Sequence, residues 1–232
     1  MNTEVKLHPS TELLNQFIQG ELSTGHSVVV SAHVLMCKSC GAKAKEFQAL
    51  AVSSWVDPKL AEQAVESKPT NYSEMVANIV ASPQQRSEAG SELMEVKLDV
   101  LDNSINLPRV LAKAAASGLS WKHLPGGISE AQVKLDDETQ CEFIYMKPGS
   151  KAPVHTHMGS ETTLVLHGEF KDELGDYGAS DFIVRDKSHH HQPLCEEGCL
   201  CFAVLDSPLR FTKGIARLMN PINRFKFKRS LA

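Results

Sequence analysis

The chain lacks any long hydrophobic run. No stretch approaches the roughly 20 consecutive apolar residues that a membrane-spanning helix needs. The opening segment, MNTEVKLHPSTELLNQF, also contains no apolar segment that could act as a signal peptide. We therefore expect a cytoplasmic protein that does not associate with membranes.

Cysteine is scarce, with six among 232 residues. Because cytoplasmic thiols stay reduced, this number excludes a disulfide scaffold and favours metal binding or redox chemistry for any clustered pair.

A strong surplus of one charge is also absent. The net charge of −4 argues against a chain that coats nucleic acid, and we expect no direct nucleic-acid binding.

The N-terminal part of the chain is patterned as helices. A first helix is expected to open at Ser10 or Thr11, and apolar residues then recur at helical intervals. A second, longer helix is predicted over 29–55, ending before Asp57-Pro58. A third helix is predicted over 72–80.

The composition changes in the middle of the chain. Residues 81–92 are small, polar and unpatterned, which is typical of a linker. Short β-rich segments follow from about residue 94, interrupted by a helical insertion at 107–118, and predict an all-β barrel or sandwich. The expected fold class is α+β, with a helical domain at 1–84, a linker at 85–94, a β domain at 95–208 and a basic tail at 209–232.

The first cluster of chemically active residues lies in the helical part. On a helix, His33, Cys37 and Cys40 fall within about a 60° arc, so three metal-binding side chains share a face. Zinc needs a fourth ligand, for which His8 and His26 are the nearby candidates. The alternatives are two buried cysteines beside an unrelated histidine, or a redox C-x-x-C, which lacks the usual βαβ surroundings.

The second cluster lies in the β-rich part. Residues 149–168 read G-x5-H-x-H-x3-E-x6-G, in which His155 and His157 share one face of a strand and Glu161 follows a Gly-Ser turn. A fourth ligand should come from a later strand. Counting along 180–193 selects His191, with His189 as the alternative because it has the same strand parity.

Three imidazoles and one carboxylate suit several divalent ions. Zinc is the expected ion, with manganese and iron as alternatives, and the opposing hypothesis is a barrel of this shape that no longer holds metal. Neither cluster contains a predicted catalytic residue. The roles of Cys195, Cys199 and Cys201 are left open between packing and oxidant sensing.

These motifs together carry a resemblance to a known family. The 149–168 motif is similar to the first cupin motif, and H…H-x-x-x-C-x-x-C resembles the zinc-binding anti-sigma factors. With E-T-T-L-V-L-H-G-E-F and W-x-x-x-P-G-G-I, the chain resembles the ChrR-type anti-sigma factors almost end to end.

The resemblance implies a function. It makes His8 the fourth zinc ligand beside His33, Cys37 and Cys40, and the β domain a cupin of the double-stranded β-helix type. It implies that residues 1–84 bind and inhibit an extracytoplasmic-function (group IV) sigma factor. The cupin would be required for a response to an oxidative signal such as singlet oxygen.

The alternative function is enzymatic. A three-histidine, one-glutamate box also occurs in cupin dioxygenases and isomerases, with the helical domain then serving regulation. The absence of a separate substrate-binding signature argues against this, so we expect no enzyme. The basic tail is interpreted as a solvated extension, with contact to an acidic partner or nucleic acid as the alternative.

Overall fold

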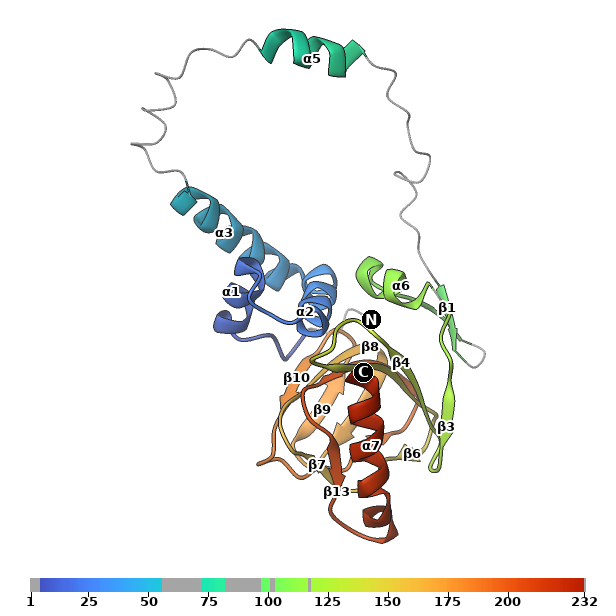
Figure 1. Ribbon diagram of the computed structural model, residues 1–232. Helices are drawn as coiled ribbons and strands as arrows, with labels where there is room; N and C mark the ends of the chain where they lie inside the picture. The colour runs from blue at the N-terminus through green and yellow to red at the C-terminus, as the bar shows by residue number, and fades with distance from the viewer. Residues whose placement is uncertain (1–4, 56–71, 82–96, 101–102, 117, 232) are drawn as a thin grey trace.

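The computed structural model describes residues 5–55, 72–81, 97–100, 103–116 and 118–231. Figure 1 shows helices α1 (Thr11–Gln19), α2 (Thr24–Met36) and α3 (Lys38–Trp55) above a β-rich half. The predicted α+β fold class is confirmed. The expected linker at 85–94 lies outside the described residues, as do Asp57 and Pro58.

Helix α1 is delimited by local chemistry at both ends. The Ser10 side chain accepts a hydrogen bond from the Leu13 backbone N–H, and Gly20 ends the helix in the left-handed conformation with φ of 74°. A side-chain acceptor at the N-cap and a glycine at the C-terminus are the usual terminators of a helix. The sequence prediction for this helix is therefore confirmed, with Ser10 rather than Thr11 as the cap.

The prediction of one continuous helix over 29–55 is wrong. Helix α2 ends at Met36, Cys37 is extended with φ −106° and ψ 110°, and α3 restarts at Lys38. Cysteine has only middling helix propensity, so tertiary contacts can decide its conformation. The break turns Cys37 towards residues outside its own helix, which helical periodicity alone does not reveal.

The β-rich half is a curved sheet in which the described strands pair antiparallel. Its main path is β3-β4-β5-β12-β8-β11-β6, with β9 and β10 both paired to β8 and a separate two-stranded sheet formed by β7 and β13. A further hairpin pairs β1 with β2. The strands are β1 (Lys97–Val100), β2 (Asn103–Asn106), β3 (Lys122–Leu124), β4 (Ile128–Val133), β5 (Gln140–Met146), β6 (Ser150–Lys151), β7 (His155–His157), β8 (Glu161–Asp172), β9 (Gly175–Gly178), β10 (Phe182–Arg185), β11 (Leu194–Cys195), β12 (Cys199–Leu205) and β13 (Leu209–Phe211).

The described chain also contains the α-helices α5 (Tyr72–Ala81), α6 (Arg109–Ala115) and α7 (Asn220–Leu231). Helices α5 and α6 confirm the predictions at 72–80 and 107–118. None of the described helices is long and apolar enough to cross a bilayer.

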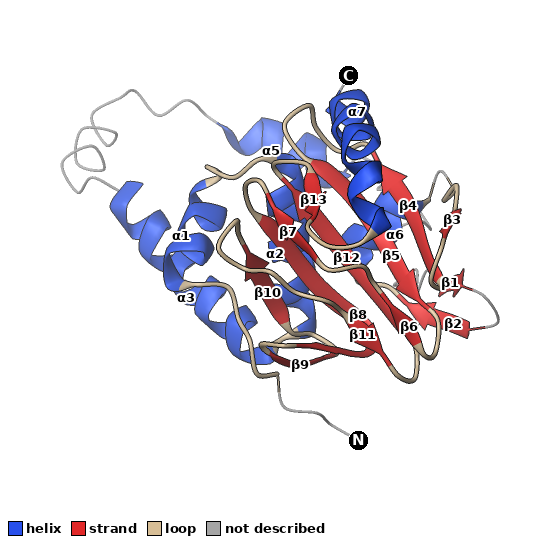
Figure 2. Cartoon of the chain, turned by 90° about the horizontal axis from the view of Figure 1, so that it is seen from below, coloured by secondary structure: helices blue, strands red, loops and turns tan. Residues whose placement is uncertain are grey.

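The C-terminal segment is part of the fold, so the interpretation of 209–232 as a solvated extension is wrong. Strand β13 pairs with β7, the short 3-10 helix η2 (Ile215–Met219) follows, and Phe227 of α7 packs against Ala203 and Leu205. Figure 2 shows α7 at the side of the strands opposite α1 and α3. The buried Phe227 ring holds this basic segment against the sheet. A count of charges in the sequence does not reveal such a contact.

The helical half and the sheet share one apolar core. Leu14, Val29 and Val30 from α1 and α2 belong to the same buried cluster as Phe143 and Phe202 of the sheet. Each such side chain contributes about 1.5–3 kcal/mol when it is fully buried. The two halves are therefore joined by packing as well as by the chain between them.

Candidate metal centres

The first candidate centre gathers residues from two helices and two connecting segments. His8 precedes α1, His33 lies on α2, Cys37 is the link between helices and Cys40 lies in the first turn of α3. One ligand atom from each of the four lies within 4.8 Å of the others. The His8 Nδ1 atom is 3.5 Å from Cys37 Sγ and 3.4 Å from Cys40 Sγ.

The chemistry of this cluster fits a cation. His33 is fully buried, and among the described residues neither of its ring nitrogens has a hydrogen-bonding partner. Burial lowers the pKa of His33 to about 4, so its imidazole is neutral and keeps a free lone pair. An orphaned buried polar group is costly unless something coordinates it, and two thiols with two imidazoles are a preferred zinc set.

The two thiols differ in acidity. Burial acts to raise the pKa of Cys37, but hydrogen bonds from Ser39 and Cys40 outweigh it and lower that pKa. Burial and the neighbouring Cys37 raise the pKa of Cys40 to about 11. Cys37 is therefore the more acidic of the two thiols, and zinc binding would release the protons that the thiols carry.

His26, the other candidate for this centre, lies elsewhere. Its Nδ1 atom is 2.8 Å from the hydroxyl of Ser23, the residue that caps α2, and burial lowers the pKa of its ring. The structure thus brings His8 and not His26 to the cysteines.

The second candidate centre lies inside the β-rich half. Strand β7 contributes His155 and His157, β8 opens with Glu161, and His191 forms an isolated bridge with His155. One ligand atom from each of the four lies within 4.8 Å of the others, and all four residues are buried. The Nε2 atom of His157 is 3.0 Å from Glu161 Oε2 and 3.2 Å from His191 Nε2.

The outer nitrogens of two of these histidines are held by partners. The Nδ1 atom of His155 is 2.8 Å from the Pro153 carbonyl oxygen, and Nδ1 of His191 is 2.9 Å from Asp172 Oδ2. Both Nδ1 atoms therefore donate, which leaves each Nε2 as a lone-pair donor facing the centre. This tautomer assignment is the one a metal ion requires.

The electrostatics of the cluster also favour a cation. Burial alone would raise the pKa of Glu161, but the neighbouring His157 outweighs it and the pKa falls to about 2. Burial and the neighbouring His191 lower the pKa of His155 to about 4. One carboxylate among imidazoles in a buried site is a donor set for a divalent ion.

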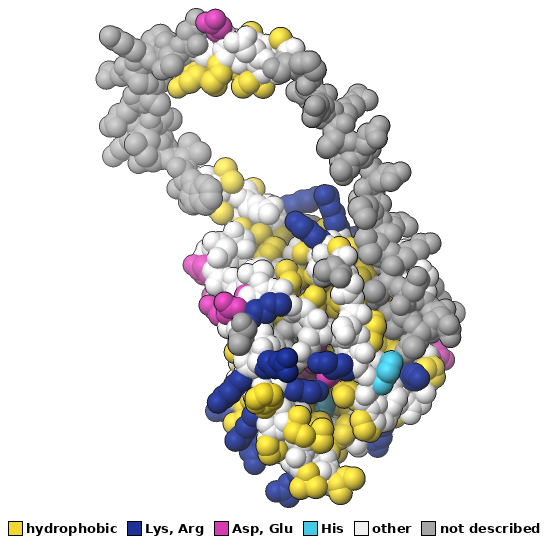
Figure 3. Space-filling model, turned by 45° about the vertical axis from the view of Figure 1, so that its right-hand side comes forward, with side chains coloured by type: hydrophobic (Ala, Val, Ile, Leu, Met, Phe, Trp, Pro, Cys, Tyr) yellow, Lys and Arg dark blue, Asp and Glu magenta, His cyan; other side chains and the backbone are white. Residues whose placement is uncertain are grey.

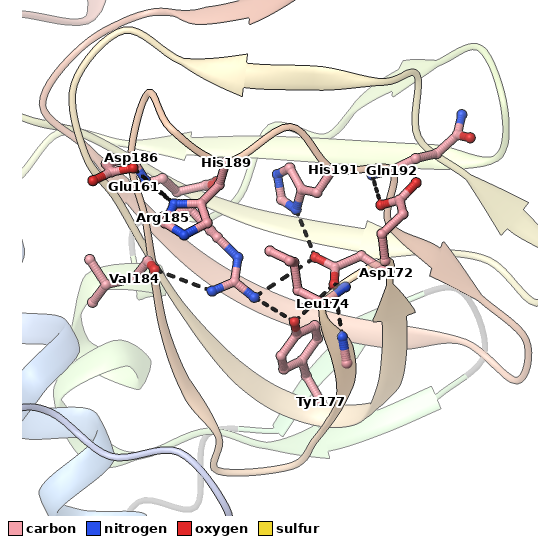
Figure 4. A network of polar contacts seen from close by, with 12 residues as sticks. Glu161, Asp172, Leu174, Tyr177, Val184, Arg185, Asp186, His189, His191 and Gln192 are labelled. Atoms are coloured by element: carbon pink, nitrogen blue, oxygen red, sulfur yellow. Dashed lines mark hydrogen bonds and ion pairs between the residues drawn. The ribbon is translucent and has the colours of Figure 1, made fainter.

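Sequence reasoning missed the carboxylate that positions His191. Asp172 ends strand β8, and its side chain also accepts hydrogen bonds from the Tyr177 hydroxyl at 2.8 Å and the Leu174 backbone N–H at 2.8 Å. Although burial tends to raise the pKa of Asp172, these bonds and the one from His191 lower it. Figure 4 shows Arg185 reaching into the same network from β10, with a hydrogen bond to Tyr177. An aspartate in a D-E-L-G turn carries no sequence signal for this role.

The other residues named in the sequence lie outside both clusters. His189, the alternative fourth ligand, pairs with Asp186 at 2.8 Å instead. Cys195, Cys199 and Cys201 are buried in an apolar cluster of the sheet. A hydrogen bond with Cys199, together with burial, raises the pKa of Cys195, so Cys195 is a protonated thiol.

A polar seam ties the first centre to the β-rich half. Asp181, which is 2% exposed, accepts hydrogen bonds from the backbone N–H groups of Lys6 and Leu7 at 2.7 and 2.9 Å. The Phe182 N–H in turn donates to the Leu7 carbonyl oxygen at 3.0 Å. The segment that carries His8 is therefore hydrogen-bonded to the start of β10.

Strand β10 spans the distance between the two centres. At one end the Phe182 ring lies edge-on to the His33 ring, with 5.5 Å between centroids. At the other end Arg185 pairs across the sheet with Glu161. A single short strand thus contacts a candidate ligand of each centre.

Comparisons with known proteins agree with this arrangement. Residues 111–207 match the ChrR Cupin-like domain family. Over 226 residues the chain is 30% identical to the anti-sigma-E factor ChrR of Cereibacter sphaeroides, covering 95% of this chain and 99% of that protein.

A solved structure is similar over most of the chain. It is the crystal structure of Rhodobacter sphaeroides SigE in complex with the anti-sigma ChrR, which matches with 28% identity and a TM-score of 0.63. The match covers 88% of this chain and all of the matched chain, 100%. With two candidate metal centres, a helical half and a cupin half in the same order, this chain belongs to the ChrR-type anti-sigma factors, a family of regulators rather than enzymes.

Proposed function

We propose that this protein binds and inhibits an extracytoplasmic-function (group IV) sigma factor in the cytoplasm, through a zinc-containing helical domain at 1–84. The observation that carries the proposal is the likeness to ChrR over 95% of the chain, including a ChrR chain crystallised with SigE. A partner that engages RNA polymerase is cytoplasmic, which is the reason for placing the protein there.

Helix α5 supplies a surface that suits such a partner. Its large apolar side chains recur at i, i+3, i+4, i+7 and i+8, the spacing of one helix face. All of them are exposed, with Tyr72 59%, Met75 54%, Val76 51%, Ile79 57% and Val80 72% accessible. Figure 3 shows this helix carrying hydrophobic side chains along one side. An apolar helix face that its own chain leaves uncovered is the type of surface that a partner buries.

The zinc proposal assigns His8, His33, Cys37 and Cys40 a structural role. These residues come from both sides of the break at Cys37, so one ion would fasten α2 to α3 and to the segment before α1. Structural zinc sites contribute folding energy directly, so losing ligands should loosen the helices that present the sigma-binding surface.

The cupin proposal assigns His155, His157, Glu161 and His191 a second metal ion, for which zinc is the expected identity. We place the response to an oxidative signal such as singlet oxygen in the cupin at 95–208. The support is that β10 contacts a candidate ligand of both centres, so a change at one can reach the other through a physical contact.

The test is co-purification with candidate sigma factors. Met75→Asp together with Val76→Asp should abolish capture, because two charges are placed in the apolar face of α5. Ala77→Asp is the matched control, since it adds a charge to the same helix on the opposite side and should leave capture intact. Equal capture by all variants would refute α5 as the contact surface.

The metal proposals have a separate readout. Cys37→Ser with Cys40→Ser should lose one zinc equivalent by metal analysis and lose sigma capture, whereas His155→Ala with His157→Ala should lose the other equivalent and keep capture. The second variant should also fail to release sigma factor after exposure to singlet oxygen. Release at the wild-type rate would contradict the assignment of the response to the cupin site.

A further inference from the structure

A cavity of about 460 Å³ opens beside the cupin centre, and His157 is part of its wall. The wall of the cavity also contains three cationic residues, Lys187, Arg210 and Arg217, and two apolar residues, Met158 and Phe211. Its size falls within the roughly 300–1,000 Å³ of small-molecule sites.

Part of the cavity wall comes from the C-terminal segment, which the sequence left without a role. In the β7–β13 pair, Arg210 lies opposite Thr156 and Phe211 opposite His155, so β13 is the immediate neighbour of the ligand strand. The Asn220 side chain brackets Phe211, accepting from its N–H at 2.8 Å and donating to its carbonyl at 3.0 Å. These bonds fix the two ends of the turn that carries Arg217.

The charges in the wall are unbalanced. Among the described residues, Lys187, Arg210 and Arg217 form no ion pair. Two acidic side chains of this region are paired with histidines, since Glu161 pairs with His157 and Asp186 pairs with His189. Figure 3 shows Lys and Arg side chains gathered over the lower half of the view, which is the β-rich half.

Three cations that line one cavity give it a positive potential that attracts an anion. Guanidinium groups match the geometry of carboxylate and phosphate oxygens, and two arginines with a lysine are typical of anion recognition. Met158 and the Phe211 ring leave an apolar surface beside these charges. A ligand that satisfies both has a charged head and a hydrocarbon body.

We propose that this cavity binds a small organic anion, a carboxylate or a phosphate ester, with its head held by Arg210, Arg217 and Lys187 and its apolar body against Met158 and Phe211. The site goes beyond sigma inhibition, because it uses neither α5 nor the first centre and its test requires no sigma factor. The ligand's place beside His157 puts it next to the cupin cluster.

The test uses three probes of one shape on the full-length protein as purified: benzoate, phenyl phosphate and neutral benzyl alcohol. Calorimetry and saturation-transfer NMR should show binding of at least one anion and none of the alcohol, and the tighter anion identifies the preferred head group. Arg210→Gln with Arg217→Gln should weaken anion binding by roughly tenfold or more, since each arginine gives up a charge-assisted hydrogen bond to the head group.

Two further variants keep the result interpretable. Lys228→Gln with Arg229→Gln removes the same charge from the exposed end of α7, outside the cavity wall, and should leave binding unchanged. Lys187→Gln alters a single exposed turn residue and should weaken binding even if the double arginine variant fails to fold. The proposal is overturned if none of the probes binds, if the alcohol binds as well as the anions, or if the arginine and α7 variants bind equally.

Discussion

The carboxylate of Asp181 offers the sharpest test of how the two halves of this protein are connected. It is buried at 2% exposure and accepts three backbone hydrogen bonds, two of them from Lys6 and Leu7 beside the candidate ligand His8. Asp181→Ala removes the acceptor without adding bulk. We expect the segment before α1 to detach from β10.

The magnitude follows from the two hydrogen bonds that cross between the halves. A hydrogen bond to a charged group contributes about 1.5–3 kcal/mol net. Lys6 and Leu7 are exposed, so water replaces part of each bond and the lower value applies. Two bonds then give about 3 kcal/mol, equivalent to a change of roughly 150-fold in the docking equilibrium.

Two assays report this change. Hydrogen exchange at residues 6–8 should accelerate, and transfer of zinc from the first centre to a chromophoric chelator should quicken because His8 is less often in place. Asp176→Ala is the matched control, since it removes an exposed carboxylate from the same turn region on β9.

If Asp181→Ala and Asp176→Ala exchange amides and release zinc at the same rates as the wild type, the seam does not position His8. If exchange accelerates while zinc release is unchanged, docking is confirmed but its link to the first centre is refuted.

Three further predictions concern other contacts. Gly25→Ala should destabilise the packing of α2 on the sheet by about 1–3 kcal/mol in chemical denaturation, because the new methyl group would lie 2.3 Å from Thr139 Oγ1; an unchanged midpoint would contradict this. Asp172→Asn should weaken metal binding at the cupin centre by roughly 10–100-fold in a competition titration, because the carboxylate that orients His191 is lost; zinc at the first centre is the internal control. Burial is the main reason that the pKa of Glu142 rises from 4.5 to about 7, so the folded state loses stability as the pH rises from about 4.5 to about 7. Glu142→Gln should therefore be more stable than the wild type by about 3 kcal/mol above about pH 8, and should show no such gain near about pH 4. Parallel pH profiles of the two proteins in urea denaturation would refute the assignment.

Much of the candidate sites follows from short-range patterns. Strand alternation puts His155 and His157 on one face, and the structure brings both to Glu161 and His191. The same parity rule did not separate His191 from His189, because residues two apart share one face of any strand that contains them. The bridge between His155 and His191, and the pairing of His189 with Asp186, decided between them.

At the first centre, the sequence grouped residues that do lie together, although the helix predicted to carry them was wrong. Helical spacing placed His33, Cys37 and Cys40 on one face of a single helix, but the helix breaks at Cys37. The side chains still converge because the break redirects α3 rather than separating it from α2. Spacing therefore identified which residues meet and misidentified how they meet.

The sequence by itself determined the order of the helical and β-rich halves, the ligand types and their local intervals, because backbone geometry repeats every few residues and leaves its period in the amino acids. Only the tertiary structure decided that Asp172 orients His191, that Asp181 secures the segment before His8, and that β13 completes a cationic cavity. These contacts join residues far apart in the chain, and their formation depends on how whole elements pack. No periodic pattern within a single element carries that information.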